Sequence, residues 1–158
     1  LAGVPEVRVR LLVLGDGPER EYLESIAGEL GMGDRVVFVG YVTERKKFDY
    51  VEISDVFIST SLHEGFGIVF MEAMHCGLPI ICSNYGGQVD FLKNEENALL
   101  VEVGNIEGYA RSIKRYMDDK KLYERCSKNN RLRIKEFYAE NVAARYTNTF
   151  KEVSESRG

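Results

Sequence analysis

Residues 9–18, VRLLVLGDGP, set the fold class of this chain. Residues 9–14 form a short and nearly continuous apolar run, and Gly15-Asp16-Gly17-Pro18 is a strong turn signal directly after it. Continuous rather than alternating apolarity predicts a strand that is covered on both faces, as in a parallel sheet. A helix is expected to follow over 18–30, because Pro18 suits a first turn and Gly31 a helix end.

The same alternation of strand and helix continues along the first hundred or so residues. Further strands are expected at 35–39, 56–59, 79–82 and 98–101, with helices at 44–51 and 67–76 and one helical turn at 88–92. This order predicts βαβ units with right-handed crossovers and one parallel sheet. The sequence therefore predicts an α/β fold, a Rossmann-like parallel sheet flanked by helices.

From residue 106 onward the chain is expected to be helical. The apolar spacing predicts helices over 106–117, 122–137 and 140–153. In the last of these, Val142, Ala143, Tyr146 and Phe150 are predicted to form a buried stripe.

Composition narrows the class of protein. A chain of 158 residues fits one domain, and 44% hydrophobic with 29% charged residues is ordinary for a globular domain. A net charge of −4 disfavours broad nucleic-acid binding, for which a basic surface is expected. Three cysteines without a C-x-x-C pair favour reduced thiols that serve as small core residues, and hence a cytoplasmic location.

Open parallel sheets bind ligands at the carboxyl ends of their strands, so the loops at 15–18, 40–42, 60–67 and 83–87 are the candidates. The first of them is a poor dinucleotide site. Arg20 stands where the third glycine of that motif belongs, and Asp16 places a negative charge where a pyrophosphate would approach. A plain turn is the favoured interpretation there.

The stretch 60–74, TSLHEGFGIVFMEAM, is far more informative. Glu64 precedes a Gly-x-Gly turn, and Glu72 lies seven intervening residues later inside the predicted helix. A turn of this kind exposes the first amides of the helix, and the helix dipole adds partial positive charge, which suits a phosphate. Carboxylates beside such a site suit hydroxyl groups, so the stretch predicts a phosphate ligand with hydroxylated rings on both sides.

That arrangement is similar to the E-x7-E motif of retaining GT-B glycosyltransferases, the group 1 family that includes mannosyltransferases and lipopolysaccharide or capsule enzymes. Residues 12–20 (LVLGDGPER), 37–42 (VFVGYV), 54–60 (SDVFIST) and 76–79 (CGLP) and the pair Gly86-Gly87 also resemble the C-terminal, donor-binding domain of that family. The resemblance covers nearly the whole chain, in order.

The resemblance implies roles for individual residues. Glu64, the implied catalytic residue, would contact hydroxyls of the donor sugar, and Glu72 would hold the ribose. Gly86 and Gly87 would shape the neighbouring loop without a contact of their own. The implied donor-binding residues are Glu64, Gly65, Phe66, Gly67, Ile68 and Glu72 in the motif, with Val42 near the base, Gly15 and Gly17 lining the cleft, and Lys47 reaching the nucleotide.

The implied reaction is transfer of a hexosyl unit from a nucleotide-diphosphate sugar to an acceptor hydroxyl with retained configuration, as in glycan, capsule or lipopolysaccharide biosynthesis. No D-x-D pair is present, so no metal is expected. The implied partners are the nucleotide sugar and an N-terminal acceptor domain of the same protein, through which peripheral membrane contact could also occur. Nucleic acid is not expected as a partner.

The chain departs from the family pattern at its beginning and at residues 89–90. It begins downstream of the Arg and Lys with which the family neutralises the leaving diphosphate, so residues 1–158 are expected to be a donor-binding fragment without the first strand and the acceptor domain. Such a fragment is predicted to be inactive alone and to bind donor weakly. Val89-Asp90 stands where the family often has Pro-Glu.

Other interpretations remain open at this point. Glu64 and Glu72 could be a glycosidase pair, but two hydrolytic carboxyls must face one bond, and these are expected to address different rings. A non-catalytic nucleotide-binding or interaction module on the same fold, and a nucleotide-sugar 2-epimerase, are the alternatives to the transferase. His63 and His75 are interpreted as structural, with His63 the better candidate to line the cleft.

Overall fold

The computed structural model describes residues 9–62 and 64–155. The chain forms two compact units, Leu1–Ile53 and Ser54–Gly158, and each has a parallel sheet of its own. The described strands therefore form two sheets instead of the one predicted, because the order of strands and helices does not specify which strands hydrogen-bond to each other. His63 and the first eight residues, on which parts of the sequence interpretation rest, lie outside the described residues.

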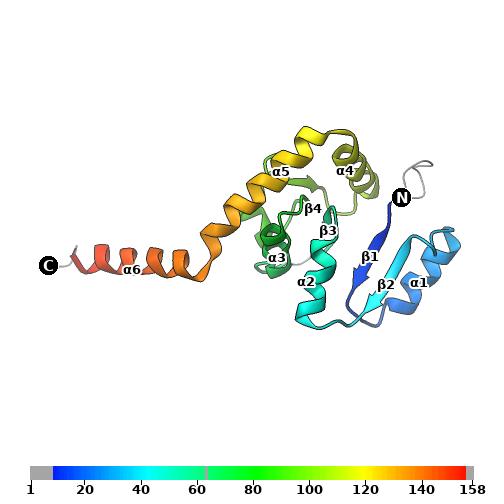
Figure 1. Ribbon diagram of the computed structural model, residues 1–158, viewed down its shortest axis with the longest axis horizontal. Helices are drawn as coiled ribbons and strands as arrows, with labels where there is room; N and C mark the ends of the chain where they lie inside the picture. The colour runs from blue at the N-terminus through cyan, green and yellow to red at the C-terminus, as the bar shows by residue number, and fades with distance from the viewer. Residues whose placement is uncertain (1–8, 63, 156–158) are drawn as a thin grey trace. The chain divides into compact units, whose positions relative to one another are not determined.

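The first unit consists of two strands and two helices, which are β1 (Leu11–Leu14), α1 (Arg20–Glu29), β2 (Val36–Gly40) and α2 (Glu44–Glu52) (Figure 1). β1 and β2 are parallel, with Leu11 opposite Val36. Thr43 begins α2 in the way expected of a helix N-cap, because its side-chain oxygen accepts a hydrogen bond from the amide of Lys46. The predicted order of strand, helix, strand, helix is confirmed for this unit.

The second unit contains a three-stranded parallel sheet in the order β3-β4-β5. Its strands are β3 (Phe57–Ser59), β4 (Ile80–Ser83) and β5 (Ala98–Val101). Its helices are α3 (Ile68–Cys76), the short η1 (Gly87–Asp90), α4 (Ile106–Asp118), α5 (Lys120–Arg133), η2 (Ile134–Phe137) and α6 (Ala139–Glu155). Figure 1 shows α5 running from α4 past α3.

The core of the second unit is centred on β4, whose four residues are all buried. Ile81 packs in one apolar cluster with residues of β5, α4 and α5, among them Tyr116 and Cys126. A strand that is buried on both faces is the arrangement expected from continuous apolarity. Two of the three cysteines, Cys82 and Cys126, are buried, and Cys76 is half-buried. No disulfide joins the three thiols, which agrees with the prediction of reduced thiols as small core residues.

The prediction of a buried stripe on the last helix is wrong. No residue of α6 is buried, and Tyr146 and Phe150 are 64% and 71% exposed. Their rings stack on each other along the helix, which Figure 1 shows leading away from the rest of its unit. An apolar pattern identifies the apolar face of a helix, but it does not say whether the same chain supplies a partner for that face. No helix in the described part of the chain is long and apolar enough to cross a membrane.

Candidate functional site

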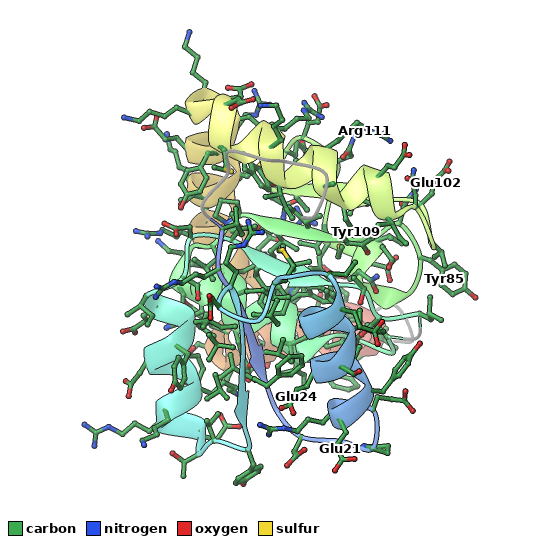
Figure 2. All side chains as sticks on the ribbon, turned by 90° about the vertical axis from the view of Figure 1, so that its right-hand side faces the viewer. Glu21, Glu24, Tyr85, Glu102, Tyr109 and Arg111 are labelled. Carbon is green, nitrogen blue, oxygen red and sulfur yellow. The ribbon has the colours of Figure 1, made fainter. Side chains whose placement is uncertain are left out.

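The loops after β3, β4 and β5 leave the sheet at the same edge. The strands are parallel and in register, with Ser59 opposite Cys82 and Cys82 opposite Leu100. Tyr85 and Glu102, which follow β4 and β5, lie at this edge in Figure 2. It is the edge at which open parallel sheets bind ligands, and the predicted motif begins there.

Gly67 determines how α3 begins. Its φ is +76° and its ψ is 58°, in the left-handed region, and a Cβ at this position would lie 2.5 Å from the ring of Phe70. Only glycine fits such a turn without strain. Gly67 has no side chain that could cap the helix, and the first turn of α3 holds no acidic residue. The start of α3 therefore has the features of an anion site that the sequence predicted.

The carboxylate of Glu64 lies beside this helix start. Its Oε2 atom is 3.7 Å from the position of a Cβ on Gly67, and the residue is half-buried. A negative charge at a helix N-terminus stabilises the helix, so Glu64 has a structural role even without a ligand. Its carboxylate oxygens are hydrogen-bond acceptors, which is the chemistry that hydroxyl groups of a ligand require.

Glu72 lies one turn into α3, on the helix face of Ile68, because residues four apart share a face. Ile68 is 67% exposed and Glu72 is half-buried. Glu64 thus precedes the first turn of α3, and Glu72 follows that turn.

Phe66 is held in the loop by its ring. The ring centroid is 6.0 Å from that of Phe91 and 6.3 Å from that of Phe137, in tilted and edge-to-face arrangements. These contacts fix the ring on one side, while Phe66 remains 55% exposed. Gly65 precedes it and has open space where a side chain would be.

Gly86 and Gly87 support this loop from the segment that follows β4, at the start of η1. The amide of Gly87 donates to the carbonyl oxygen of Glu64 at 3.1 Å, and a Cβ on Gly87 would overlap the carbonyl oxygen of Gly65. Gly86 has a φ of +106°, which favours glycine. The prediction that this pair shapes the neighbouring loop is confirmed.

Three side chains that the sequence interpretation missed donate hydrogen bonds to backbone groups at this edge of the sheet; they are Tyr109, Ser83 and Gln88. The hydroxyl of Tyr109 donates to the carbonyl oxygen of Ser59 at 3.0 Å, and Ser83 Oγ donates to that of Ser61 at 3.1 Å. Gln88, almost fully buried, donates from Nε2 to the carbonyl oxygens of Ser83 and Tyr85. Bonds between a side chain and a backbone group 50 residues away leave no local pattern in the sequence, so no motif could have revealed them.

In the first unit, Gly15 and Gly17 form the turn after β1. Gly15 has a φ of +113°, and its amide donates to the carbonyl oxygen of Gly40 at 2.9 Å. The amide of Gly17 donates to Oδ1 of the adjacent Asp16 at 2.9 Å, so the aspartate side chain bonds within the turn. Val42 follows β2 and is half-buried.

Lys47 lies on α2 and already has an acidic neighbour. Its Nζ is 2.9 Å from a carboxylate oxygen of Glu44, and the ammonium lies 5.3 Å from the centroid of the Phe48 ring. Lys47 would have to share or leave Glu44 to reach a phosphate, as the resemblance implies it does.

Arg20 explains why the turn after β1 lacks a third glycine. Its guanidinium donates from Nη2 to the carbonyl oxygen of Phe38 at 3.2 Å and pairs with Glu24 at 2.8 Å. A Cβ on Gly40 would lie 2.9 Å from Nη1 of Arg20. The side chain therefore ties α1 to β2, which agrees with a structural turn rather than a dinucleotide site.

His75 has a structural partner, as predicted. Its Nδ1 lies 3.0 Å from the hydroxyl of Tyr138, and the two rings pack edge to face. Within the described residues, no three His, Cys, Asp or Glu side chains gather into a group that could hold a metal ion.

Comparison with known proteins places these features in a family context. Residues 4–133 match the family model described as "Glycosyl transferases group 1". The chain is 40% identical over 117 residues to the lipopolysaccharide core biosynthesis glycosyltransferase LpsD of Rhizobium meliloti, a match that covers 74% of this chain and 34% of that protein.

Solved structures give the same fold. Sucrose-phosphate synthase from Thermosynechococcus elongatus matches with a TM-score of 0.82 and 31% identity, covering 98% of this chain and 40% of its own. HepE of Anabaena, solved with UDP-glucose, matches with a TM-score of 0.79 and 23% identity, covering 96% of this chain and 43% of its own, and at that identity shows the fold alone. The predicted Rossmann-like fold of a GT-B C-terminal half is confirmed, and the chain spans less than half of each of these proteins.

Proposed function

Because the chain belongs to the group 1 glycosyl transferase family, we propose that it binds the nucleotide-diphosphate sugar donor of a retaining hexosyltransferase. The observation that carries the proposal is the start of α3, where Gly67 leaves the first amides without a side-chain cap and the Glu64 carboxylate lies beside them. A helix start of this kind attracts phosphate, and the adjacent carboxylate accepts hydrogen bonds from sugar hydroxyls.

Each part of the motif takes one part of the donor. The amides of Gly67 and Ile68 bind the diphosphate, Glu64 holds hydroxyls of the transferred sugar, and Glu72, one turn further along, holds the ribose. The turn after β1 at Gly15 and Gly17, with Val42 and Lys47, takes the remainder of the nucleotide.

The proposed reaction keeps the anomeric configuration. The bond between the anomeric carbon and the diphosphate oxygen breaks, and its electron pair stays on the diphosphate. The acceptor oxygen bonds to the same face of the anomeric carbon, and its proton passes to an oxygen of the departing diphosphate. The protein contributes positioning and electrostatic support of the leaving group, and no metal is required in this scheme.

The identities of the acceptor and of the transferred sugar depend on the whole protein, of which this chain is a part. LpsD takes its name from lipopolysaccharide core biosynthesis, and it is 40% identical to this chain over 117 residues. That likeness supports a hydroxyl of lipopolysaccharide, or of a related glycan or capsule, as the acceptor class. The proposed transferred group is a hexosyl unit, with mannosyl among the candidates, and it rests on the resemblance of the motif alone. We further propose that the acceptor binds to a separate domain of the protein.

The decisive experiment is an NMR titration of the chain with UDP, GDP and ADP up to millimolar concentration. The amides of Phe66, Gly67 and Ile68 are expected to shift with one nucleotide more than with the others, in the presence of either EDTA or Mg²⁺. Glu72→Gln is expected to reduce the effect. Glu102→Gln serves as the matched control, because Glu102 is an exposed acid that follows β5 at the same edge of the sheet (Figure 2).

The titration detects weak binding, so a negative result is informative. No shift at the start of α3 with any of the three nucleotides would contradict the donor-binding proposal. Nucleotide binding without transferase activity in a form of the protein that includes the acceptor domain would instead support the alternative of a non-catalytic nucleotide-binding module.

A further inference from the structure

Three tyrosine hydroxyls fasten α4 and α5 to the strands of the second unit. Tyr116 donates to the carbonyl oxygen of Ile80 at 3.1 Å, and Tyr123 donates to that of Asp55 at 3.0 Å. Both acceptors lie at the amino ends of their strands, since Ile80 begins β4 and Asp55 precedes β3. These two bonds therefore lie at the end of the sheet opposite to the candidate site.

Tyr109 makes the same kind of bond at the other end of the sheet. Its hydroxyl donates to the carbonyl oxygen of Ser59, the last residue of β3, at 3.0 Å. Figure 2 shows Tyr109 on the side of α4 that faces the strands, whereas Arg111 points away from them. Tyr109 is thus the tyrosine of the three that acts at the start of the loop carrying Glu64.

Ser83 links this hydroxyl to a second point on the same loop. Its Oγ lies 3.0 Å from the hydroxyl of Tyr109 and 3.1 Å from the carbonyl oxygen of Ser61, and the residue is 2% exposed. The hydroxyls of Tyr109 and Ser83 contact each other and the carbonyl oxygens of Ser59 and Ser61. The two loop carbonyl groups are therefore held by one connected pair of hydroxyls.

The surroundings keep the pair in its neutral, donating form. Burial raises the pKa of Tyr109, although the hydrogen bond with Ser83 lowers it in part. The ring of Tyr109 packs against the apolar cluster around Ile81, so α4 fixes the position of the hydroxyl. Ser83 is fixed by β4, which is buried along its whole length.

We propose that Tyr109, acting through Ser83, is a positioning residue that holds the described loop residues, 60–62 and 64–67, in the conformation in which Glu64 meets the sugar of the donor and the amide of Gly67 meets its diphosphate. The inference rests on the proposed function, because it assigns the pair a task in nucleotide-sugar binding. Tyr109 does not touch the donor in this scheme. It limits the conformations of the backbone at Ser59 and Ser61, and hence the position of Glu64 three residues further along.

The variant Tyr109→Phe tests the proposal, because it removes the hydroxyl and leaves the ring in the apolar cluster. A loop that spends less time in the competent conformation binds its ligand more weakly in proportion. The affinity for the nucleotide that binds the wild type best is expected to fall roughly three- to tenfold, which corresponds to the loss of one ordinary hydrogen bond. The amides at 61–62 and 64–67 are expected to exchange with solvent faster in the absence of nucleotide.

The matched control is Tyr123→Phe. Tyr123 is also a half-buried tyrosine that donates to a backbone carbonyl oxygen, next to the same strand but at its other end. The variant Tyr123→Phe should lower the stability of the chain to a similar extent. It should leave amide exchange at 61–62 and 64–67 and the nucleotide affinity unchanged. Ser83→Ala is the second test variant, because it breaks the same link from β4 and does not depend on how Tyr109→Phe folds.

The outcomes separate the two proposals. Equal loop exchange and equal nucleotide affinity in Tyr109→Phe, Ser83→Ala and Tyr123→Phe would overturn the positioning role while the donor site stands. A wild-type chain that shows no shift with UDP, GDP or ADP would overturn the proposed function, and the assignment of Tyr109 to donor binding would fall with it. Weaker binding and faster loop exchange in the first two variants alone supports both.

Discussion

The amide nitrogen of Gly87 lies 3.1 Å from the carbonyl oxygen of Glu64, so the loop after β4 is hydrogen-bonded to the loop after β3. The contact continues to Gly65, whose carbonyl oxygen occupies the space where a side chain on Gly87 would be. Two backbone segments in such close approach have no flexible side chain between them that could give way. The conformation of one loop therefore depends on the residue type in the other.

Gly87→Ala tests this dependence. The added methyl group would overlap the carbonyl oxygen of Gly65, so one of the two loops must move, at a cost of roughly 1–3 kcal/mol. Nucleotide affinity is expected to fall at least tenfold in an NMR titration, because the displaced loop leads into Gly67, whose amide is proposed to bind the diphosphate. Gly28→Ala is the control, since a Cβ there meets nothing within 4 Å and alanine is the better helix former in α1. Equal nucleotide affinities in the two variants would contradict the role of the close approach.

The two carboxylates are predicted to read different parts of the donor. Glu72→Gln should weaken binding of the free nucleoside diphosphate and of its glucose conjugate alike, because both contain the ribose. Glu64→Gln should weaken only the conjugate. Each loss is expected to be roughly tenfold, as for a hydrogen bond to a charged acceptor. Comparison of the four dissociation constants measures this, and a Glu64→Gln loss that is equal for both ligands would argue against a sugar contact.

Asn130 is predicted to be a major contributor to the stability of the second unit. Its side-chain amide is fully buried in α5 and donates to the carbonyl oxygens of Leu78 and Asn97, at 2.7 and 2.9 Å. Asn130→Ala would leave two buried acceptors unpaired, which is expected to lower the free energy of unfolding by roughly 2–4 kcal/mol.

The neighbouring asparagine provides the control for this measurement. Asn129 also donates its side-chain amide to a backbone carbonyl oxygen, that of Glu96, but near the surface. Asn129→Ala should cost less than about 1 kcal/mol, because water replaces the lost partner. Urea unfolding of both variants gives the comparison, and similar losses would show that burial is not the source of the Asn130 contribution.

Local patterns predicted the elements of this fold closely, but they did not predict the partners of every side chain. The apolar run ALLV forms β5 with the predicted bounds, Ala98–Val101, since a short buried strand is encoded by its own residues. The stripe at Tyr146 and Phe150 was identified as apolar and wrongly taken to be buried, because burial depends on a partner elsewhere in space.

The candidate site divides in the same way. The motif around Glu64 and Gly67 was recognisable because the glycine turn, the helix start and the acids follow one another in sequence. The link of Tyr109 to Ser59 and Ser83 was not, because it joins residues that are 50 and 26 positions apart in the sequence and meet only in the folded chain. Tertiary packing alone gives that hydroxyl its place.

The stability of the chain is predicted to fall at alkaline pH because of Cys82. Burial raises the pKa of this thiol from 9.0 to about 12, so between these values the unfolded chain loses a proton that the folded chain retains. The contribution of Cys82 is therefore complete below pH 9.0 and is lost as the pH rises toward about 12. Burial raises the pKa of Tyr116 as well, which acts in the same direction. Urea midpoints measured at pH ~8 and ~10.5 should differ clearly in the wild type and less in Cys82→Ala. An equal change of the urea midpoint between the two pH values in both chains would show that folding does not raise the pKa of this thiol.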